Sequence, residues 1–351
     1  MSKSKLTLLI DGNWLLMSRL AVISNKYVDD TDLSNHLQLL MTQSIKRVLK
    51  QFPEIDNIIV CADGGSWRTS LEIPNYLIDE NGQKVVYKGN REKSADINWD
   101  IIFQGYENYL TLCTKNNINN YRIHNIEGDD LIWYLSTTLN KQGTNCMIWS
   151  KDNDLKQLVN IDKNKCFTVW WNQDNGIFIT DYNDDNLDFL FNIEFNENDQ
   201  ILNHLSLKYP VTKINKNDII LDKIIRGDLG DNILPIAYKV SNTSDKKFRI
   251  STKDIDFSLD WKNDQEIYNY LSQLYNSKKY KNKLSDTLDN IFDHFKYNRQ
   301  LVVLDTDSYP IEIKEIFDNI NIPNEQYKDI LVIENYLQTK INNINGIIEF
   351  I

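Results

Sequence analysis

The sequence has few of the residues that mark several common protein classes. It contains only four histidines and four cysteines among 351 residues, and no two cysteines have the C-x-x-C spacing of zinc or redox sites. Cys61 and Cys146 lie within apolar runs, which favours buried free thiols over disulfides or zinc ligands. His124 has no serine or cysteine beside it, so a histidine-based hydrolase is not expected.

Long hydrophobic runs are also missing. No apolar run approaches the ~18 residues that a membrane-spanning helix needs. The run that follows Lys5 is too short for the core of a signal peptide. We find no internal repeat and no low-complexity linker. We therefore expect a cytoplasmic protein without a membrane partner.

Acidic residues are in excess, and the formal net charge is −11. A negative surface argues against a nucleic-acid partner, because phosphate binding usually requires positive charge. Nine acids that we assign below to one site account for most of this charge. Basic clusters also occur at Lys84–Lys93 and Lys246–Arg249. The net charge therefore does not exclude a polyanionic substrate.

Short apolar runs that end at acidic residues dominate the first half of the chain. They predict strands at Leu6–Ile10, Ile58–Ala62, Tyr121–Ile126 and Cys146–Trp149. Amphipathic segments between them predict helices at Asn35–Gln51, Asp96–Thr114 and Leu131–Leu139. A strand pair with a turn is expected at 167–179, and helices at 200–208, 216–225, 267–275, 283–297 and 330–341. The alternation indicates an α/β fold with a mostly parallel sheet flanked by helices, followed by a mainly helical region.

Nine carboxylates are the candidate site, and seven of them directly follow predicted strands. They are Asp11, Asp63, Glu127, Asp129, Asp130, Asp152, Asp154, Asp228 and Asp231. The carboxyl ends of parallel strands gather along one edge of a sheet. Oxygen ligands without histidine or cysteine favour Mg²⁺, with Mn²⁺ as a substitute. Two such ions suit the attack of water on a phosphodiester.

Other interpretations of these residues stay open at this level. Helix capping explains one acid at the start of the helix after Glu127, but not three in four residues. A phosphatase or phosphotransferase with Asp11 as nucleophile is the second candidate. Such enzymes place another acid two residues later, where this chain has Asn13. The basic segment Lys84–Lys93, with Tyr87, is either a solvated loop or a flap that binds a phosphate backbone.

Five motifs resemble, in order and spacing, those of the 5'-nuclease family, which includes flap endonucleases and the 5'-exonuclease domain of bacterial DNA polymerase I. The motifs are Leu9–Asn13, Cys61–Asp63, Glu127–Asp130, Ser150–Asp154 and Gly227–Asn232. Three further segments look most similar to the RNase H branch of T-even bacteriophages: Ser66–Arg68, Tyr87–Arg91 and Leu301–Asp305. A phage-encoded protein of this type would act in the host cytoplasm.

The resemblance implies a PIN-like catalytic domain at 1–195, with a helical arch near 66–115. It also implies a helical domain at 196–351 with a modified helix-turn-helix DNA-binding region. The expected activity is Mg²⁺-dependent removal of RNA primers and 5' flaps during replication. The expected substrates are DNA and RNA–DNA hybrids with 5' ends or flaps. Expected partners are a single-strand-binding protein or a sliding clamp, and the chain is expected to be a monomer.

The resemblance also assigns roles residue by residue. Ligands of a first ion are Asp11, Asp63, Glu127, Asp129 and Asp130, and ligands of a second are Asp152, Asp154, Asp228 and Asp231. Catalytic residues are Lys88, Arg91 and Asp130. Substrate contacts are Trp67, Arg68, Tyr87, Lys88, Arg91, Lys246, Lys247 and Arg249.

The chain departs from most relatives after Asn232. Ile233–Lys239 lacks the glycines of the hairpin that binds duplex DNA and potassium in those relatives, so duplex contact is expected to use the basic cluster at Lys246–Arg249 instead. A non-catalytic DNA-binding relative of the same fold is the remaining alternative. Nine mutually repelling carboxylates near phosphate argue against it, because a protein that only binds DNA gains nothing from them.

Overall fold

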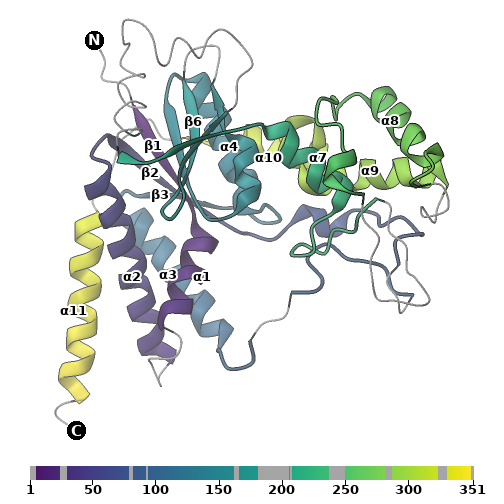
Figure 1. Cartoon of the computed structure of the whole chain (residues 1–351). Coiled ribbons are helices and arrows are strands. Elements are labelled where there is room, and N and C mark those ends of the chain that lie inside the picture. The colour runs from purple at the N-terminus through teal and green to yellow at the C-terminus, as the bar shows by residue number, and fades with distance from the viewer. Residues whose placement is uncertain are drawn as a thin grey trace, which may run out of the picture. The chain divides into compact units, whose positions relative to one another are not determined.

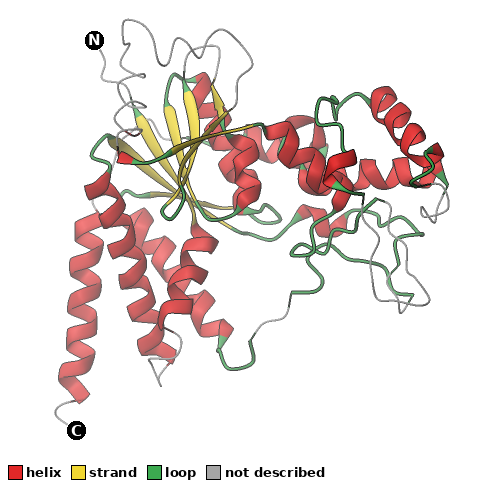
Figure 2. Ribbon diagram, in the orientation of Figure 1, coloured by secondary structure: helices red, strands yellow, loops and turns green. Residues whose placement is uncertain are grey.

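The computed structural model of the chain describes residues 5–23, 30–78, 82–91, 94–161, 166–180, 205, 208–236, 250–280, 287–322 and 330–348 (Figures 1 and 2). Its contacts divide the chain into two compact units. Unit 1 comprises Met1–Gly65, Ser94–Ile214 and Asn319–Ile351, and unit 2 comprises Ser66–Lys93 and Asn215–Asp318. Each unit is described by itself.

An eight-stranded, mostly parallel sheet forms the centre of unit 1. Seven strands follow the order β3-β2-β1-β4-β6-β7-β8, and β5 pairs with β6 at the side. The parallel strands of the main part are β1 Leu6–Asp11, β2 Ile55–Ala62, β3 Asn119–Arg122, β4 Asn145–Trp149 and β6 Phe167–Asn172. The remaining strands are β5 Asn160–Ile161 and β7 Gly176–Thr180, both antiparallel to β6, and β8 Val211–Ile214, parallel to β7. The predicted α/β class is thus confirmed.

Helices cover both faces of this sheet. They are α1 Gly12–Ile23, α2 Asp30–Gln51, α3 Trp99–Lys115, α4 Gly128–Lys141 and α11 Ile330–Ile348. Leu8 and Ile10 belong to the core that the sheet shares with α1, α2 and α3, while Leu9 points to the other face, where α4 contacts β1 and β4. The C-terminal helix α11 lies alongside α2 (Figure 1), and a 2.5 Å ion pair joins Lys46 to Glu334.

Unit 2 is mainly helical. It contains α7 Lys216–Arg226, α8 Asp264–Asn276, α9 Leu288–Val302 and α10 Ile311–Asp318. Leu77 and Tyr87, from the segment that the sequence interpretation placed in the arch, are buried in the same core as Ile224 and Phe295. The segment 66–93 therefore packs with these later helices.

Several boundaries differ from the sequence prediction. Strand β3 ends at Arg122, and Ile123–Ile126 is a turn closed by a 3.1 Å hydrogen bond from Ile126 N to Ile123 O. Asn125 has a φ of 59°, a conformation that a strand does not contain. Glu127 therefore follows a turn rather than a strand. Helix α1 and strand β8 were not predicted.

Other predictions fall partly outside the described residues. The predicted helix at 200–208 is one of them, and the start of the helix predicted at 283–297 is another. All four cysteines are buried free thiols, as expected. None of the described helices combines the length and the apolar character that crossing a bilayer requires.

Candidate active site

The carboxyl ends of three adjacent strands place acids at one edge of the sheet in unit 1. Asp11 is the last residue of β1 and lies in register with Cys61 of β2, so Asp63 follows two residues beyond. Ile10 lies in register with Trp149, the last residue of β4, and Ser150 and Asp152 follow it. The parallel register therefore brings together residues that are more than a hundred positions apart in the sequence.

The Asp11 carboxylate, at the end of β1, is buried, with 7% of the residue's surface exposed. Its Oδ1 accepts a 2.9 Å hydrogen bond from Trp14 N, and its Oδ2 accepts a 2.7 Å bond from the Ser150 hydroxyl. Burial, with a smaller contribution from the charges of Asp63 and Asp152, raises the pKa of Asp11 to about 7, although the two hydrogen bonds act to lower it. Its partners are neutral donors, so they orient this carboxylate without cancelling its charge.

Asp63 joins the ends of two strands to the start of α4. The Asn13 side chain donates a 2.7 Å hydrogen bond to Asp63 Oδ2 and accepts a 3.1 Å bond from Asp63 N. Gly128 N donates a 2.7 Å bond to Asp63 Oδ1. A Cβ atom at Gly128 would lie 3.1 Å from that oxygen and 3.2 Å from Cys61 O, so glycine permits this close approach.

The acids at the start of α4 can serve in helix capping and in metal binding. Asp130 is completely buried and accepts a 3.3 Å hydrogen bond from Glu127 N, which is the capping contact considered from the sequence. Glu127 is also buried, whereas Asp129 is partly exposed. The positive end of the helix dipole favours negative charge here. Capping accounts for Asp130. Burial raises the pKa of Cys61, and the charges of Asp11 and Asp129 both add to this rise.

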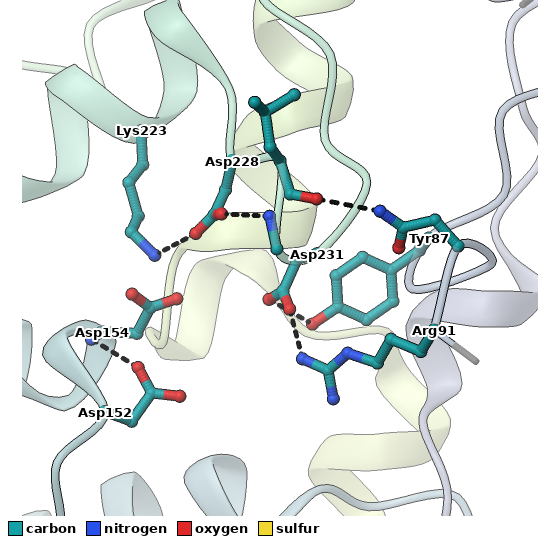
Figure 3. Close-up of polar contacts among 10 residues, drawn as sticks. Tyr87, Arg91, Asp152, Asp154, Lys223, Asp228 and Asp231 are labelled. Carbon is teal, nitrogen blue, oxygen red and sulfur yellow. Dashed lines mark hydrogen bonds and ion pairs between the residues drawn. The ribbon is translucent and has the colours of Figure 1, made fainter. Parts of the chain in front are cut away.

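Asp152 and Asp154 follow β4 at the more exposed side of this edge. Asp152 N donates a 2.9 Å hydrogen bond to the Ser150 hydroxyl, so Ser150 connects Asp152 to Asp11. Asp152 begins a short 3-10 helix, Asn153–Leu158, and accepts a 2.9 Å bond from Asp154 N (Figure 3). This turn holds both carboxylates beside the end of β4.

Asp228 lies in unit 2, in the loop that ends α7. Lys223 donates a 2.6 Å hydrogen bond to its Oδ2, and Gly230 N donates a 2.8 Å bond to its Oδ1 (Figure 3). Burial raises the pKa of Asp228, but the bond and charge of Lys223 and the backbone donors outweigh it, so the net shift is downward. Gly227 has a φ of 68°, and a Cβ there would lie 2.3 Å from Ile233 O, so only glycine fits this turn.

Asp231 belongs to the same loop and is bound by the basic segment of unit 2. Arg91 donates a 2.5 Å hydrogen bond to its Oδ1, and the Tyr87 hydroxyl lies 3.4 Å from its Oδ2 (Figure 3). Lys88 N donates a 2.8 Å bond to the carbonyl oxygen of Asp231. Asn90 binds Leu229 O at 2.9 Å. Residues 87–91 of the segment that was predicted to be a solvated loop or a flap are thus hydrogen-bonded to the acidic loop.

The remaining predicted substrate contacts occupy different environments. Tyr87 is only 6% exposed, and Trp67 and Arg68 are buried, with the Arg68 guanidinium 4.6 Å from the Trp67 ring and 6.0 Å from the Tyr309 ring. These three side chains pack in unit 2, and their contact with a substrate stays a prediction. Lys88 is partly exposed, with its ammonium 5.0 Å from the Tyr87 ring. Lys246, Lys247 and Arg249 lie outside the described residues.

Three residues of this edge were not identified from the sequence. Asn13 and Ser150 lie inside the acidic motifs, and their polar side chains could have been recognised as supports for Asp63 and Asp11. Tyr106 of α3 is buried, and its hydroxyl has no hydrogen-bond partner among the described residues. Burial, together with the charges of Asp11 and Asp63, raises the pKa of Tyr106 well above its usual value. No periodic pattern distinguishes such a tyrosine from its neighbours in the core.

The donor set of this edge suits a hard divalent cation. The potential ligand atoms of this edge are carboxylate oxygens. Burial disfavours the charged form of Asp11, and a bound cation would stabilise that form at neutral pH. Burial keeps the nearby Cys61 thiol protonated, which removes the softer alternative ligand. The side chains of this edge could therefore hold a divalent cation.

Comparison with known proteins agrees with this geometry. The model of a family described as 5'-3' exonuclease, N-terminal resolvase-like domain, matches residues 6–184. No curated protein sequence matches the chain.

Among solved structures, the chain is similar to the bacteriophage T5 flap endonuclease in a pseudo-enzyme–product complex with DNA and metal ions. The identity is 18% and the TM-score 0.54, over 94% of this chain and 100% of that chain. The same values hold for bacteriophage T5 5'-exonuclease with bound zinc ions. At this identity the similarity is one of fold.

Proposed function

Because the chain belongs to the 5'-3' exonuclease family with an N-terminal resolvase-like domain, we propose that it is a Mg²⁺-dependent nuclease of the phage RNase H type. It hydrolyses the phosphodiester bonds of RNA primers and of 5' flaps or ends during DNA replication. The observation that carries this proposal is the edge of unit 1, where the register of β1, β2 and β4 gathers carboxylates around the buried Asp11.

The same edge argues against the phosphatase alternative. In that class an acid two residues after the nucleophile donates a proton to the leaving group. Here the position is occupied by Asn13, whose amide is engaged with Asp63 on both sides. An amide held in this way orients a carboxylate and cannot act as an acid. The site is therefore better suited to metal binding than to a covalent aspartyl intermediate.

The first ion is assigned to Asp11, Asp63, Glu127, Asp129 and Asp130. When bound, such ions activate water and stabilise the leaving oxygen of a phosphodiester. The chain's own donors fix the ligands before any ion arrives. Ser150 and Trp14 N orient Asp11, and Gly128 N orients Asp63. This preorganisation lowers the cost of assembling the site.

The second ion is assigned to four acids by the resemblance alone: Asp152 and Asp154 of unit 1, and Asp228 and Asp231 of unit 2. Asp228 and Asp231 already have cationic partners in Lys223 and Arg91. We therefore expect each of them to contribute less to metal affinity than the acids of the first group. Asp228→Asn should weaken cleavage, and Asp130→Asn should abolish it.

Lys88 and Arg91 are proposed to hold the scissile phosphate. The Arg91 side chain is 57% exposed although it pairs with Asp231, so a substrate phosphate can replace this carboxylate as its partner without a large loss of burial. A planar guanidinium binds a phosphate with two parallel hydrogen bonds. Tyr87 and Trp67 are proposed to support this segment through packing, in addition to the predicted substrate contacts.

The decisive experiment uses labelled 5'-flap DNA and an RNA-primed duplex, with Mg²⁺ or with EDTA. We expect cleavage only with the metal, no cleavage by Asp130→Asn or Asp154→Asn, and retained DNA binding by both variants. Asp100→Asn, at an exposed position in the first turn of α3, is the matched control and should remain active. Undiminished cleavage by both site variants would refute the metal assignment. Stable binding without any product from the unaltered chain would favour the non-catalytic relative.

Comparison of flap, nicked and RNA-primed substrates in the same assay tests the finer part of the proposal. An RNase H-type enzyme should release ribonucleotides from the primed duplex at least as fast as it cleaves the DNA flap. A strong preference for the DNA flap would assign the chain to the flap endonuclease branch instead.

A further inference from the structure

Two asparagines of unit 2 join the basic segment to the acidic loop 227–233. The Asn90 side chain donates a 2.9 Å hydrogen bond from its Nδ2 to Leu229 O. The Asn232 side chain donates a 2.8 Å bond from its Nδ2 to Val86 O. Each amide therefore reaches from its own segment to a main-chain carbonyl of the other segment. We name this reciprocal pair of hydrogen bonds the asparagine clasp.

The backbone between the two clasp bonds has an unusual conformation. Lys88 N donates a 2.8 Å hydrogen bond to Asp231 O, and Lys88 has a φ of 55°. Glycine or asparagine adopts this left-handed conformation at lower cost than lysine does. Such conformations persist where the surrounding structure enforces them, and they concentrate at functional sites. The clasp therefore helps to hold the Lys88 backbone in a conformation that lysine does not favour.

Packing fixes the inner ends of both segments but leaves their outer ends to hydrogen bonds. Tyr87 and Ile233 are buried in the same core of unit 2. Asn90, Arg91 and Leu229 are exposed, and exposed parts of a chain receive little restraint from apolar packing. The clasp bonds are therefore needed to restrain Arg91 relative to the acidic loop.

The clasp does not involve the charged groups that it brings together. Arg91 pairs with the Asp231 carboxylate at 2.5 Å (Figure 3), whereas the clasp joins neutral amides to main-chain oxygens. Salt weakens an exposed ion pair, but it has little effect on a hydrogen bond between neutral groups. The Arg91 guanidinium can therefore leave Asp231 for a substrate phosphate while the two segments remain joined.

We propose that Asn90 and Asn232 are positioning residues that fix the cations of Lys88 and Arg91 relative to the acidic loop. This inference rests on the proposed function, in which those cations hold the scissile phosphate. The asparagines act through the cations and not by contact with the reacting atoms. Displacing a reacting group by about 1 Å can lower a rate on the order of a hundred-fold, whereas the affinity for DNA depends mainly on the number of positive charges. Loss of the clasp should therefore lower kcat more than it lowers the affinity for DNA.

The test measures cleavage of labelled 5'-flap DNA with Mg²⁺, and binding of the same DNA in EDTA. Asn90→Ala and Asn232→Gly each remove one clasp donor, and glycine accepts the φ of 57° at position 232 without strain. We expect kcat to fall by about ten-fold or more in each variant, and the affinity for DNA to change by less than about three-fold, because every charge is retained. Asn90→Gln keeps an amide donor at an exposed position and should restore most of kcat.

Asn276→Ala is the matched control. It removes a 2.9 Å hydrogen bond from an exposed asparagine amide to Ser272 O, within α8 of the same unit. This variant therefore loses a bond of the same chemistry and length outside the clasp. It should cleave and bind DNA as the unaltered chain does.

Two further measurements separate positioning from a general loss of stability. Hydrogen–deuterium exchange of residues 86–91 in EDTA should become about three- to ten-fold faster in Asn232→Gly, since one hydrogen bond is lost, and should be unchanged in Asn276→Ala. When Asn232→Gly is combined with Arg91→Ala, the fall in kcat should be much smaller than the product of the two single losses. A displaced arginine no longer contributes, so its removal costs little more.

The possible outcomes distinguish this inference from the proposed function. An unaltered chain that cleaves nothing refutes the proposed function, and the catalytic role of the clasp with it. If the unaltered chain cleaves, undiminished kcat in both Asn90→Ala and Asn232→Gly overturns the clasp inference alone. An equal fall in kcat in Asn276→Ala, or losses that multiply fully when Asn232→Gly is combined with Arg91→Ala, would overturn it as well.

Discussion

Replacing Asp11 by asparagine should stabilise the metal-free protein near pH 8. The carboxylate is buried, receives hydrogen bonds only from the neutral donors Trp14 N and Ser150 Oγ, and faces the negative charges of Asp63 and Asp152. Asparagine has nearly the same shape and keeps an oxygen for Trp14 N. It removes the buried charge.

The magnitude follows from the pKa of Asp11, which rises from 3.8 to about 7 on folding. The folded state thus holds this proton more tightly than the unfolded chain does. The stability that the protonated Asp11 provides is fully present below pH 3.8 and is lost as the pH rises to about 7. Three pKa units correspond to about 4 kcal/mol. We subtract about 1 kcal/mol for the altered hydrogen bond with Ser150, so Asp11→Asn should gain about 3 kcal/mol near pH 8.

Urea unfolding in EDTA, near pH 5 and near pH 8, provides the measurement. The free energy of unfolding of the unaltered chain should fall by about 2–3 kcal/mol between these pH values relative to that of Asp11→Asn. Asp100→Asn, which changes the net charge equally at an exposed position, should follow the unaltered chain. Equal pH dependence in Asp11→Asn and the unaltered chain, or a lower stability of Asp11→Asn near pH 8, would refute the reasoning.

Three further predictions concern unfolding in urea. Gly12→Ala should lower the free energy of unfolding by roughly 1–3 kcal/mol, because its Cβ would lie 2.2 Å from the Tyr106 hydroxyl and 2.8 Å from Cys61 O. Adding Tyr106→Phe should restore part of this loss. An unchanged free energy of unfolding in Gly12→Ala would contradict this packing. Burial lowers the pKa of His294 to about 3, so between pH 7 and pH 5 the imidazole becomes protonated in the unfolded chain but not in the folded protein. The free energy of unfolding should therefore drop by about 2 kcal/mol over this range. His294→Gln should abolish this drop. Asn13→Asp replaces the amide that donates to Asp63 with another carboxylate. It should lower the free energy of unfolding in EDTA by about 1–3 kcal/mol and increase the stabilisation that Mg²⁺ provides. An unchanged response to Mg²⁺ would argue against a cation at this edge.

The sheet and its acidic edge could be predicted because the signals are local. Strands β1, β2 and β4 contain short apolar runs, and an acid ends each strand or follows it within three residues, as Asp11 follows Ile10. Parallel pairing then follows from the alternation with helices. The observed register pairs Asp11 with Cys61 and Ile10 with Trp149, so the carboxyl ends of the three strands lie together, as the sequence predicts.

Features that depend on distant contacts could not be predicted in this way. Helix α1 carries apolar residues on its exposed side, such as Met17 and Val22, as well as on the side that α2 and the sheet cover, so its sequence has little amphipathic pattern. The turn that shortens β3 is held by hydrogen bonds from Gly64 and Asn125 to each other's segment. Tyr87 looks like an exposed aromatic among lysines in the sequence, and it is buried because helices more than a hundred residues later cover it.

The acids of the two units differ in how their charge is balanced, which gives a physical basis for the unequal roles proposed for them. Asp11 receives its hydrogen bonds from neutral groups, and these cannot offset the cost of a buried charge. Asp228 and Asp231 are paired with Lys223 and Arg91, and the pKa of Asp228 is lowered accordingly. A cation arriving at Asp11 relieves an existing penalty, whereas a cation arriving at Asp228 must compete with an ammonium already in place. Metal affinity should therefore depend more on the first group, and Lys223→Met should increase the contribution of Asp228 by removing that competitor.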